Sequence, residues 1–324
     1  MSTIREITQT GEANNNGGAR RRLREVHFGE HLTARGHCRR SLMTSGPGIL
    51  WVMIFLLVPL VAIAVISFMT RGEAGGHERP FTFENYTRLM GFGFFGFDFG
   101  LYPTIILRSV SLGAGTTALC VLAALPLAFF IAALPPRFKN TGLTLVLIPF
   151  WTNLLIRTYA WQILLAPESW ITQAAACLHL VKPGEPLYPS AFAIYAGMVC
   201  DYLPFLVLPL YASVEKIDWA IAEAASDLGA NAPRVFWHAI LPQVTPGLVA
   251  GVILVLIPAT GQFVIPDLLG GAKTVMIGNV IQQQFGPSRD WPFGSAISCL
   301  VMGLVLLSLW AYARSAGEKG EQIL

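Results

Sequence analysis

Charged side chains are scarce in this sequence. Only 13% of its 324 residues are Asp, Glu, Lys or Arg, and 54% are hydrophobic, whereas charged residues make up about 25% of an ordinary soluble domain. This shortage of charge excludes the ordinary soluble class. Apolar runs recur at lengths close to the roughly 20 residues that a helix needs to cross a bilayer. The sequence therefore predicts an all-α membrane protein.

Motifs for catalysis and for metal binding are also missing. The nearest match to a Walker A nucleotide loop, at 271–274, lacks the glycine that should precede its lysine. The six histidines are scattered, without a His-Glu-x-x-His or Cys-x-x-Cys pair for a metal, and no Gly-x-Ser-x-Gly elbow occurs. We therefore expect that this chain is no enzyme and binds no metal and no cofactor.

Two features of exported proteins are missing as well. Three of the five cysteines lie in apolar runs and only Cys177 falls in a predicted external loop, which excludes an external disulfide framework. No small-residue cleavage site follows the first apolar run, and the basic region before it is too long for a signal peptide. The first run is therefore predicted to remain in the membrane.

Six apolar runs are predicted to cross the membrane. They lie at about 48–69, 104–133, 142–166, 190–213, 246–266 and 293–313. Pro126 is expected to interrupt the second run, and the spacing of Gly247 and Gly251 in the fifth predicts close packing against another helix. The predicted domains are a disordered basic tail at 1–46, a six-helix membrane domain at 47–315 and a C-terminal tail at 316–324.

Lys and Arg are concentrated on one side of the predicted membrane. The two tails, the turn at 134–141 and the stretch at 214–245 together carry more than twice as many of them as the intervening loops. The positive-inside rule therefore places both termini and the 214–245 stretch in the cytoplasm. The same rule explains the basic run at 20–24 as a topology signal, in preference to a site for nucleic acid or anionic lipid.

The stretch 215–246, between the fourth and fifth runs, is neither continuously apolar nor rich in loop residues. Its first half predicts a short helix with an apolar face and a neighbouring acidic face; these faces hold Ala220, Ala224 and Leu228, and Glu223 with Asp227. Gly229 suits a C-terminal cap, and Asn231 can start a second helix. Leu241-Pro242 is expected to close the segment before the fifth run. The stretch therefore predicts a helix–turn–helix at the membrane surface.

Glu223-Ala224-Ala225, Gly229 and Leu241-Pro242 resemble the EAA loop of ABC-importer permeases. The resemblance implies a type I ABC importer permease whose cytoplasmic coupling helix sits in a groove of a separate ATPase subunit. Ala239 stands where the motif usually has a larger aliphatic residue. The implied coupling residues are Glu223, Ala224, Ala225, Asp227, Gly229, Leu241 and Pro242. The alternative is an interfacial amphipathic helix with no docking role.

Longer strings over 48–313 are similar to the permeases of spermidine/putrescine importers, most of all to the one usually called the B subunit. The strings include Pro149-Phe150-Trp151-Thr152-Asn153, Leu203-Pro204-Phe205, Leu208-Pro209-Leu210-Tyr211 and Arg289-Asp290-Trp291-Pro292-Phe293-Gly294. This resemblance implies polyamine import into the cytoplasm by alternating access through the bacterial inner membrane. It implies as partners a second related permease, an ATPase dimer that binds ATP and Mg, a periplasmic binding protein and membrane lipid, but no nucleic acid.

Two alternatives to polyamine import stay open at this point. One is a permease for another small cationic or amine-bearing solute. The other, from a different class, is a carrier or channel that works without an ATPase.

Asp201 lies near the middle of the fourth run, where a charge costs roughly 2.5–3.5 kcal/mol on insertion scales. Pro204 lacks an N–H and frees the carbonyl of Cys200 beside it, so irregular backbone is expected there. Arg157 is the charged residue of the third run. Two interpretations remain: Asp201 and Arg157 neutralise each other structurally, or Asp201 faces the substrate path.

A path for a flexible polycation needs carboxylates for its ammonium groups and aromatic faces for its chain. The residues predicted to supply them are Asp201, Tyr202, Asp267, Trp151 and Tyr159. Tyr159 also fits an interfacial aromatic belt, as does Trp161. Both interpretations of these aromatic residues stay open.

Overall fold

The computed structural model describes residues 46–320, except for 73–74, 91, 94–95, 98–100, 179–181, 183 and 272–273. The chain divides into two compact units, residues 1–62 and 63–324, and each is considered by itself. The predicted basic tail, apart from its last residue, lies outside the described residues. Residues 316–320 continue a helix, and 321–324 of the predicted C-terminal tail lie outside the described part.

The first apolar run forms a helix over Gly46–Ile66. Its large side chains are exposed; Ile49, Leu50 and Trp51 retain 59%, 62% and 66% of their surface. An apolar helix of this length with exposed side chains is suited to lipid, because its backbone groups are bonded within the helix. The run was predicted to reach residue 69, but the helix ends at Ile66 and Met69 opens a strand.

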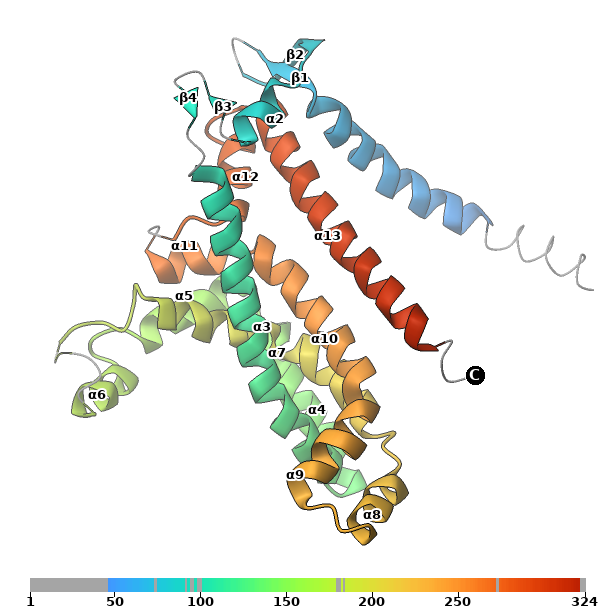
Figure 1. Cartoon of the computed structure of the whole chain (residues 1–324). Coiled ribbons are helices and arrows are strands. Elements are labelled where there is room, and N and C mark those ends of the chain that lie inside the picture. Colours follow the sequence, from blue (N-terminus) through green and yellow to red (C-terminus); the bar gives the residue numbers. More distant parts are fainter. Residues whose placement is uncertain are drawn as a thin grey trace, which may run out of the picture. The chain divides into compact units, whose positions relative to one another are not determined.

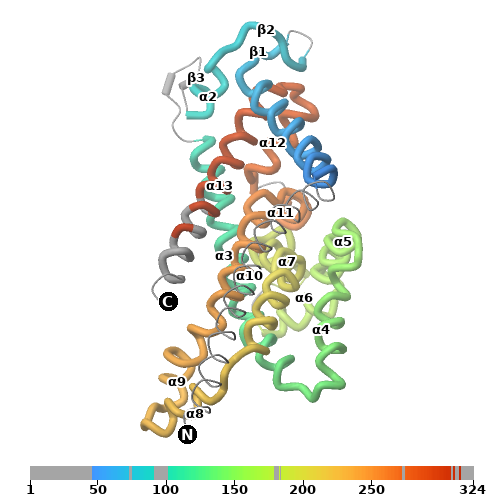
Figure 2. The backbone as a smooth tube through the Cα atoms, turned by 90° about the vertical axis from the view of Figure 1, so that its right-hand side faces the viewer, coloured from blue at the N-terminus to red at the C-terminus, as the bar shows by residue number. Residues whose placement is uncertain are grey.

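Three long helices pack together in the second unit (Figures 1 and 2). They are α3 (Leu101–Ala133), α7 (Ala191–Val214) and a continuous helix over Ala232–Gly261. The last one consists of α9 (Ala232–Val235), a π-helical turn η1 (Phe236–Ile240) and α10 (Leu241–Gly261). Small and branched apolar side chains fill their interface, including Ala124, Leu206, Val207, Leu210, Val255 and Ala259.

Two glycines allow α7 and α10 to approach each other closely. A Cβ atom on Gly247 would lie 2.2 Å from Ser213 Oγ and 2.4 Å from the carbonyl oxygen of Pro209. A Cβ on Gly251 would lie 3.0–3.2 Å from Leu206. The predicted close packing at Gly247 and Gly251 is therefore confirmed, and α7 is the helix on which they pack.

The third apolar run is broken, although a single helix was predicted there. It forms α4 (Pro136–Trp151) and α5 (Leu154–Leu164), whose axes differ by 92°. Thr152 is extended and Asn153 caps α5, its side chain accepting a hydrogen bond from Leu155 N at 2.8 Å. Hydropathy does not reveal this bend, because both halves are apolar. Pro126, by contrast, was expected to interrupt α3, which passes through it without a break.

The predicted number of six spans is not confirmed. Four described helices are long and apolar enough to cross a membrane, or five if the bent α4–α5 pair counts as one span. In α13 (Trp291–Gly320) the apolar stretch found among the described residues is Trp291–Leu307, which is not counted among these spans. The fifth run was predicted at 246–266, but its helix begins at Ala232 and ends at Gly261. The chain is nonetheless a multi-pass membrane protein.

Short elements join these helices. They are the strands β1 (Met69–Arg71), β2 (His77–Phe81), β3 (Phe92–Gly93) and β4 (Gly96–Phe97), and the helices α2 (Glu84–Leu89), α6 (Trp170–Cys177), α8 (Trp219–Asp227), α11 (Val264–Gly270) and α12 (Ile277–Phe285). The strands form two antiparallel hairpins, β1–β2 and β3–β4.

Asp290 organises one end of the second unit, at the start of α13. Asp290 is 2% exposed. Its carboxylate lies 3.2 Å from the Arg88 guanidinium of α2 and accepts a hydrogen bond from Phe293 N at 3.3 Å. The Arg88 guanidinium lies 4.4 Å from the centre of the Phe293 ring. This node ties α2 to α13 at the end of the unit opposite α8 and α9 (Figure 1).

Candidate functional site

The predicted coupling helix is α8, and a side chain from α10 holds its first turn. The Asp218 carboxylate caps α8 by accepting a hydrogen bond from Ala220 N at 3.0 Å. Gln243 Oε1 accepts a hydrogen bond from Asp218 N at 2.9 Å, and Gln243 Nε2 lies 3.5 Å from the Asp218 carbonyl oxygen. The first turn of α8 is therefore attached to the long helix that follows it in the chain.

The other end of α8 is closed by Gly229, which has a φ angle of +83°. Gly229 N donates to the Ser226 carbonyl at 2.9 Å, and Ala230 N donates to the Ala225 carbonyl at 3.1 Å. These two bonds form the Schellman motif, in which a glycine at positive φ ends a helix. The predicted capping role of Gly229 is confirmed.

The second helix starts where predicted but does not end at Leu241-Pro242. Asn231 caps it, its side chain accepting a hydrogen bond from Arg234 N at 3.2 Å. In the π-helical turn, Leu241 N donates to the carbonyl of Phe236. This wider turn precedes Pro242, which lacks an N–H, so the helix continues through the proline into the membrane run. Leu241-Pro242 therefore connects the surface helix to a span.

One face of α8 is used within the chain. Ala222, Val235 and Ala239 form a small buried cluster, with Ala225 packed against it. The small side chain of Ala239, where the EAA motif usually has a larger residue, thus lies in the contact between α8 and the π-helical turn. Ala225, which the resemblance assigns to the coupling surface, is half-buried against this cluster.

The opposite face of α8 is exposed. Ala224, Glu223 and Asp227 all lie on this surface. Leu228 is 90% exposed, and Trp219 and Ile221 are 53% and 50% exposed. The predicted apolar face of Ala220, Ala224 and Leu228 is therefore uncovered in the single chain, at one tip of the second unit (Figure 1).

A second candidate site lies where α5 meets α7. Arg157 Nη2 forms an ion pair with Asp201 Oδ1, and each side chain is only 11% exposed. Arg157 Nη1 also donates a hydrogen bond to the carbonyl oxygen of Pro149 in α4. One guanidinium thus joins α4, α5 and α7 across the bend at Thr152 and Asn153. The structure brings together the two charges whose relation the sequence left open.

Aromatic side chains adjoin this ion pair, but they are only partly the predicted ones. Tyr202 is 6% exposed, and its side chain interacts with Gln262 and with the charge of Arg157. The Phe205 ring lies 6.3 Å from that of Tyr202 and 5.1 Å from that of Phe150. Asp201 and Phe205 are one turn apart in α7 and therefore share a face.

Phe150, Phe205 and Gln262 were not predicted as site residues. Phe150 and Phe205 stand in strings that carried the family resemblance, and the i, i+4 spacing from Asp201 is a signal that identifies Phe205. Gln262 had no such signal, because it lies just after the end of α10, where helical spacing no longer relates residues. Its Oε1 accepts hydrogen bonds from Phe263 N at 3.0 Å and Val264 N at 3.3 Å.

The other predicted path residues lie on surfaces. Trp151 is 73% exposed at the end of α4, and Tyr159 is 51% exposed on α5. Asp267 is exposed on α11, and its carboxylate makes no ion pair with any residue that the structure describes. The Asp201 ion pair and these three residues are therefore not joined by any described contact.

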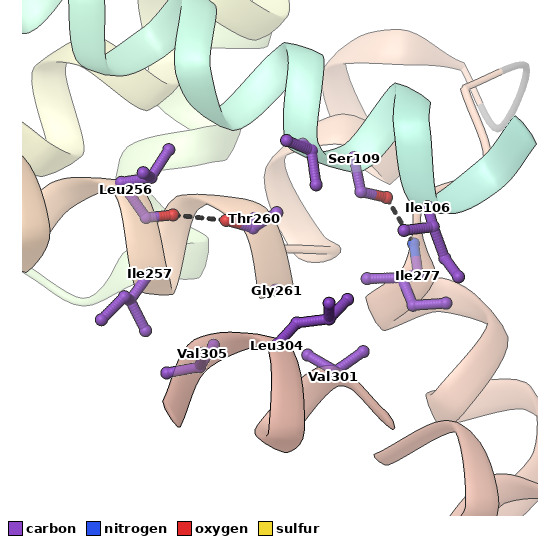
Figure 3. Close-up of a pocket in the computed structure, with 11 residues that line it drawn as sticks. Ile106, Ser109, Leu256, Ile257, Thr260, Gly261, Ile277, Val301, Leu304 and Val305 are labelled. Carbon is purple, nitrogen blue, oxygen red and sulfur yellow. Dashed lines mark hydrogen bonds between the residues drawn. The ribbon is translucent and has the colours of Figure 1, made fainter. Parts of the chain in front are cut away.

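An apolar pocket of about 290 Å³ lies elsewhere, between α3, α10, α12 and α13 (Figure 3). The hydroxyl groups of its lining residues form hydrogen bonds within the chain. Thr260 Oγ1 donates to the Leu256 carbonyl, and Ser109 Oγ accepts from Ile277 N at 2.8 Å. The lining residues that the structure describes carry no charge. The described lining includes neither Arg157 nor Asp201, so the pocket is separate from the ion-pair site. It also offers a polycation no counter-charge.

Comparisons with known proteins agree with this architecture. No protein-family model matches the sequence. The chain is 39% identical over 274 residues to the spermidine/putrescine transport system permease protein PotB of Escherichia coli, covering 84% of this chain and 97% of that protein. It is 38% identical over 265 residues to PotB of Haemophilus influenzae, covering 82% of this chain and 90% of that protein.

The fold has a counterpart among solved structures. One match is a bacterial alginate ABC transporter in complex with an alginate pentasaccharide-bound periplasmic protein, with a TM-score of 0.59 and 15% identity. It covers 84% of this chain and 93% of the matched chain. Together with the apolar helices, these relatives make the chain a multi-pass inner-membrane transport subunit and not an enzyme. The chain belongs to the PotB family of ABC-transporter permease subunits.

Proposed function

We propose that this chain is the permease subunit through which an ABC importer moves polyamines, such as spermidine and putrescine, from the periplasm to the cytoplasm. The observation that carries the proposal is its kinship, over most of its length, with permeases named for spermidine/putrescine transport.

The chemistry of the buried site supports the substrate class. A polyamine has ammonium groups joined by methylene chains, so its path requires anionic groups and surfaces that accept a hydrocarbon chain. Asp201 supplies a carboxylate, and Tyr202 with Phe205 supplies aromatic faces, which attract ammonium groups. Asp267, Trp151 and Tyr159 are exposed and would line the path where this chain meets neighbouring subunits.

The energy would come from partner chains. We assign ATP and Mg to a dimer of separate ATPase subunits, one of which would receive the exposed face of α8. The uncovered Leu228 and the adjacent Glu223 and Asp227 support this assignment, because exposed apolar residues beside charges are typical of an interaction surface. A second, related permease would complete the membrane path, and a periplasmic binding protein would deliver the substrate.

The orientation follows the distribution of cations in the sequence. Both termini and α8 would be cytoplasmic, because the Lys- and Arg-rich segments lie on their side of the predicted membrane. The β1–β2 hairpin and the Arg88–Asp290 node would then be periplasmic. On this arrangement ATP-driven closure of the ATPase dimer would move α8, and the continuous helix from Ala232 would carry that motion into the membrane.

The test is uptake by cells that lack their own polyamine importers and express this chain with its partner subunits. We expect accumulation of labelled putrescine and spermidine that disappears when this chain is omitted. A labelled basic amino acid serves as the competing cation. Accumulation of the amino acid without either polyamine would contradict the proposed substrate, and uptake that persists without the ATPase subunits would contradict the proposed energy source.

A further inference from the structure

The Arg157–Asp201 ion pair keeps two opposite charges away from water. Each side chain is 11% exposed, and the pair lies between helices that belong to the packed unit. Removal of one partner from such a pair leaves a buried charge uncompensated, which is strongly unfavourable. Asp201 is therefore able to release Arg157 readily only when another cation takes its place.

We propose that Asp201 is a binding site for an ammonium group of the transported cation, and that Arg157 fills this site while the path is empty. This inference rests on the function proposed above. An alkylammonium group carries the same charge as a guanidinium and donates hydrogen bonds to a carboxylate. Its arrival replaces one ion pair by another, so the Asp201 carboxylate is never left without a counter-charge.

The surroundings of Asp201 suit this ligand. Phe205 lies one turn further along the same face of α7, and Tyr202 is the next residue in the chain. The ring of Phe150 lies 5.1 Å from that of Phe205. An ammonium group is attracted to aromatic faces, and the methylene chain that follows it packs on the same rings. A carboxylate next to Tyr202 and on the same face of α7 as Phe205, whose ring contacts that of Phe150, is thus a suitable set of groups for one end of an alkyl polyamine.

Arg157 has a second partner that keeps it in place after the exchange. Its Nη1 donates to the Pro149 carbonyl in the last turn of α4, where the helix dipole is negative. The displaced guanidinium keeps this acceptor at the bend but loses its counter-charge, which favours its return to Asp201 when the cation leaves. The charge contact between α5 and α7 is lost while the cation is bound. Arrival of a cation would thus loosen α5 from α7, whereas a neutral or anionic solute would leave the pair closed.

A pair that is purely structural behaves differently when its charges are removed together. Replacement of both residues by neutral ones of similar shape is often tolerated at a buried ion pair, because no uncompensated charge remains. The double variant Arg157→Gln/Asp201→Asn would then keep full transport. If Asp201 is an ammonium site, the same variant assembles but loses the cation. The two roles are therefore separable by one variant.

The experiment uses the purified complex of this chain with its partner permease and ATPase subunits, in detergent and without the binding protein. The melting temperature is recorded against spermidine, against putrescine and against 1,4-butanediol, which has the length of putrescine but no charge. A ligand that binds the folded state raises the melting temperature. Lys182→Gln/Glu185→Gln is the control, because it neutralises an exposed pair 4.0 Å apart. Putrescine uptake is then measured in proteoliposomes with the binding protein added.

We expect polyamines, and not butanediol, to stabilise the unsubstituted complex and the control. Arg157→Gln/Asp201→Asn should lose this stabilisation and take up putrescine at less than a tenth of the unsubstituted rate. Equal stabilisation, or uptake within twofold of the unsubstituted rate, would overturn the proposal. If the double variant does not assemble, Arg157→Lys decides the question. It keeps both charges but loses the guanidinium that contacts Asp201 and the Pro149 carbonyl together, so spermidine should act at several-fold lower concentration. An unchanged concentration dependence would also overturn it.

Uptake by the unsubstituted complex tests the polyamine function independently of the site at Asp201. If the unsubstituted complex imports another cation and ignores polyamines, the polyamine function fails, and the same variants are measured with that cation. Loss of its binding in the double variant would then support the site at Asp201. If the unsubstituted complex imports only uncharged or anionic solutes, both proposals are wrong.

Discussion

Gln243 of α10 accepts a hydrogen bond from the backbone N–H of Asp218, the residue that caps α8, at 2.9 Å. The same side chain donates through Nε2 to the Ala239 carbonyl at 2.8 Å in its own helix. One amide thus connects the start of the surface helix to the helix that enters the membrane. A displacement of α8 by a partner would pull on α10 through this contact as well as through the chain between them.

Replacing Gln243 by Ala should weaken coupling without preventing membrane insertion. Loss of a hydrogen bond of this kind costs about 1 kcal/mol, or roughly a five-fold change in an equilibrium. We expect ATPase stimulation by the loaded binding protein to fall by a similar factor. Gln283→Ala, at an exposed position in α12, is the control, and an equal loss there would contradict the assignment.

Gly229 allows a test of the cap of α8. No atom lies within 4 Å of the position that a Cβ would take, so Gly229→Ala meets only the backbone penalty of its φ of +83°, about 1–2 kcal/mol. We expect α8 to fray and ATP-driven uptake to fall, with Asn tolerated better than Ala. Gly184→Ala introduces the same penalty at a φ of +86°, also in open space, after α6. An equal loss of ATP-driven uptake at both glycines would show that the loss does not depend on the cap of α8.

Leu228 provides a test of partner binding that is independent of folding. Because it is 90% exposed, Leu228→Ser removes almost no contact within the chain. We expect the melting temperature of the chain alone to be unchanged and the recovery of ATPase subunits with it to fall several-fold. Leu178→Ser is matched to it, since Leu178 is 72% exposed and ends α6 in the same way. Undiminished ATPase recovery with Leu228→Ser would remove Leu228 from the docking surface.

Cysteine labelling tests the orientation. Cys177 is exposed at the end of α6, whereas Cys120 is buried in α3 and serves as an internal unlabelled position. A membrane-impermeant thiol reagent added to intact spheroplasts should label Cys177 and not Cys38, which lies in the predicted cytoplasmic tail outside the described residues. Labelling of Cys38 alone would invert the topology and place α8 on the side away from ATP.

Hydropathy predicted two of the three packed helices, α3 and α7, closely. The fourth run was expected at 190–213 and α7 spans Ala191–Val214, because a long apolar segment flanked by a Ser cap and polar residues has few alternatives in a membrane. The helix α8 and the start of α9 were also predictable, since Gly229 and Asn231 are local signals that act through their own backbone neighbours.

The bend and the continuous helix were not predicted, for opposite reasons. Between α4 and α5 the chain stays apolar, so the only signal for the break is Asn153, a capping residue within an apolar run. At Leu241-Pro242 a helix-breaking residue is present, but the π-helical turn before it removes the conflict. Tertiary packing decides such cases, and a single sequence does not record it.

The two charged residues of the candidate site were predictable from the sequence, but only some of the aromatic residues near them were. Two opposite charges in separate apolar runs must each be compensated, so a relation between Arg157 and Asp201 follows from the cost of burying charge. Which aromatic rings lie beside them depends on the bend in α4–α5, which brings Phe150 to Phe205 and leaves Trp151 exposed. Aromatic content alone therefore identified Tyr202 but not Phe205, whose ring contacts those of Tyr202 and Phe150, nor Phe150 itself.

The most direct measurement of the central claim is the initial rate of labelled putrescine uptake by proteoliposomes that contain this chain, its partner permease and the ATPase dimer. The rate is compared with and without internal ATP and external binding protein. We predict uptake that requires both, that spermidine inhibits and that 1,4-butanediol leaves unchanged. Uptake that persists without ATP, or a complex that hydrolyses ATP but moves neither polyamine, would contradict the account.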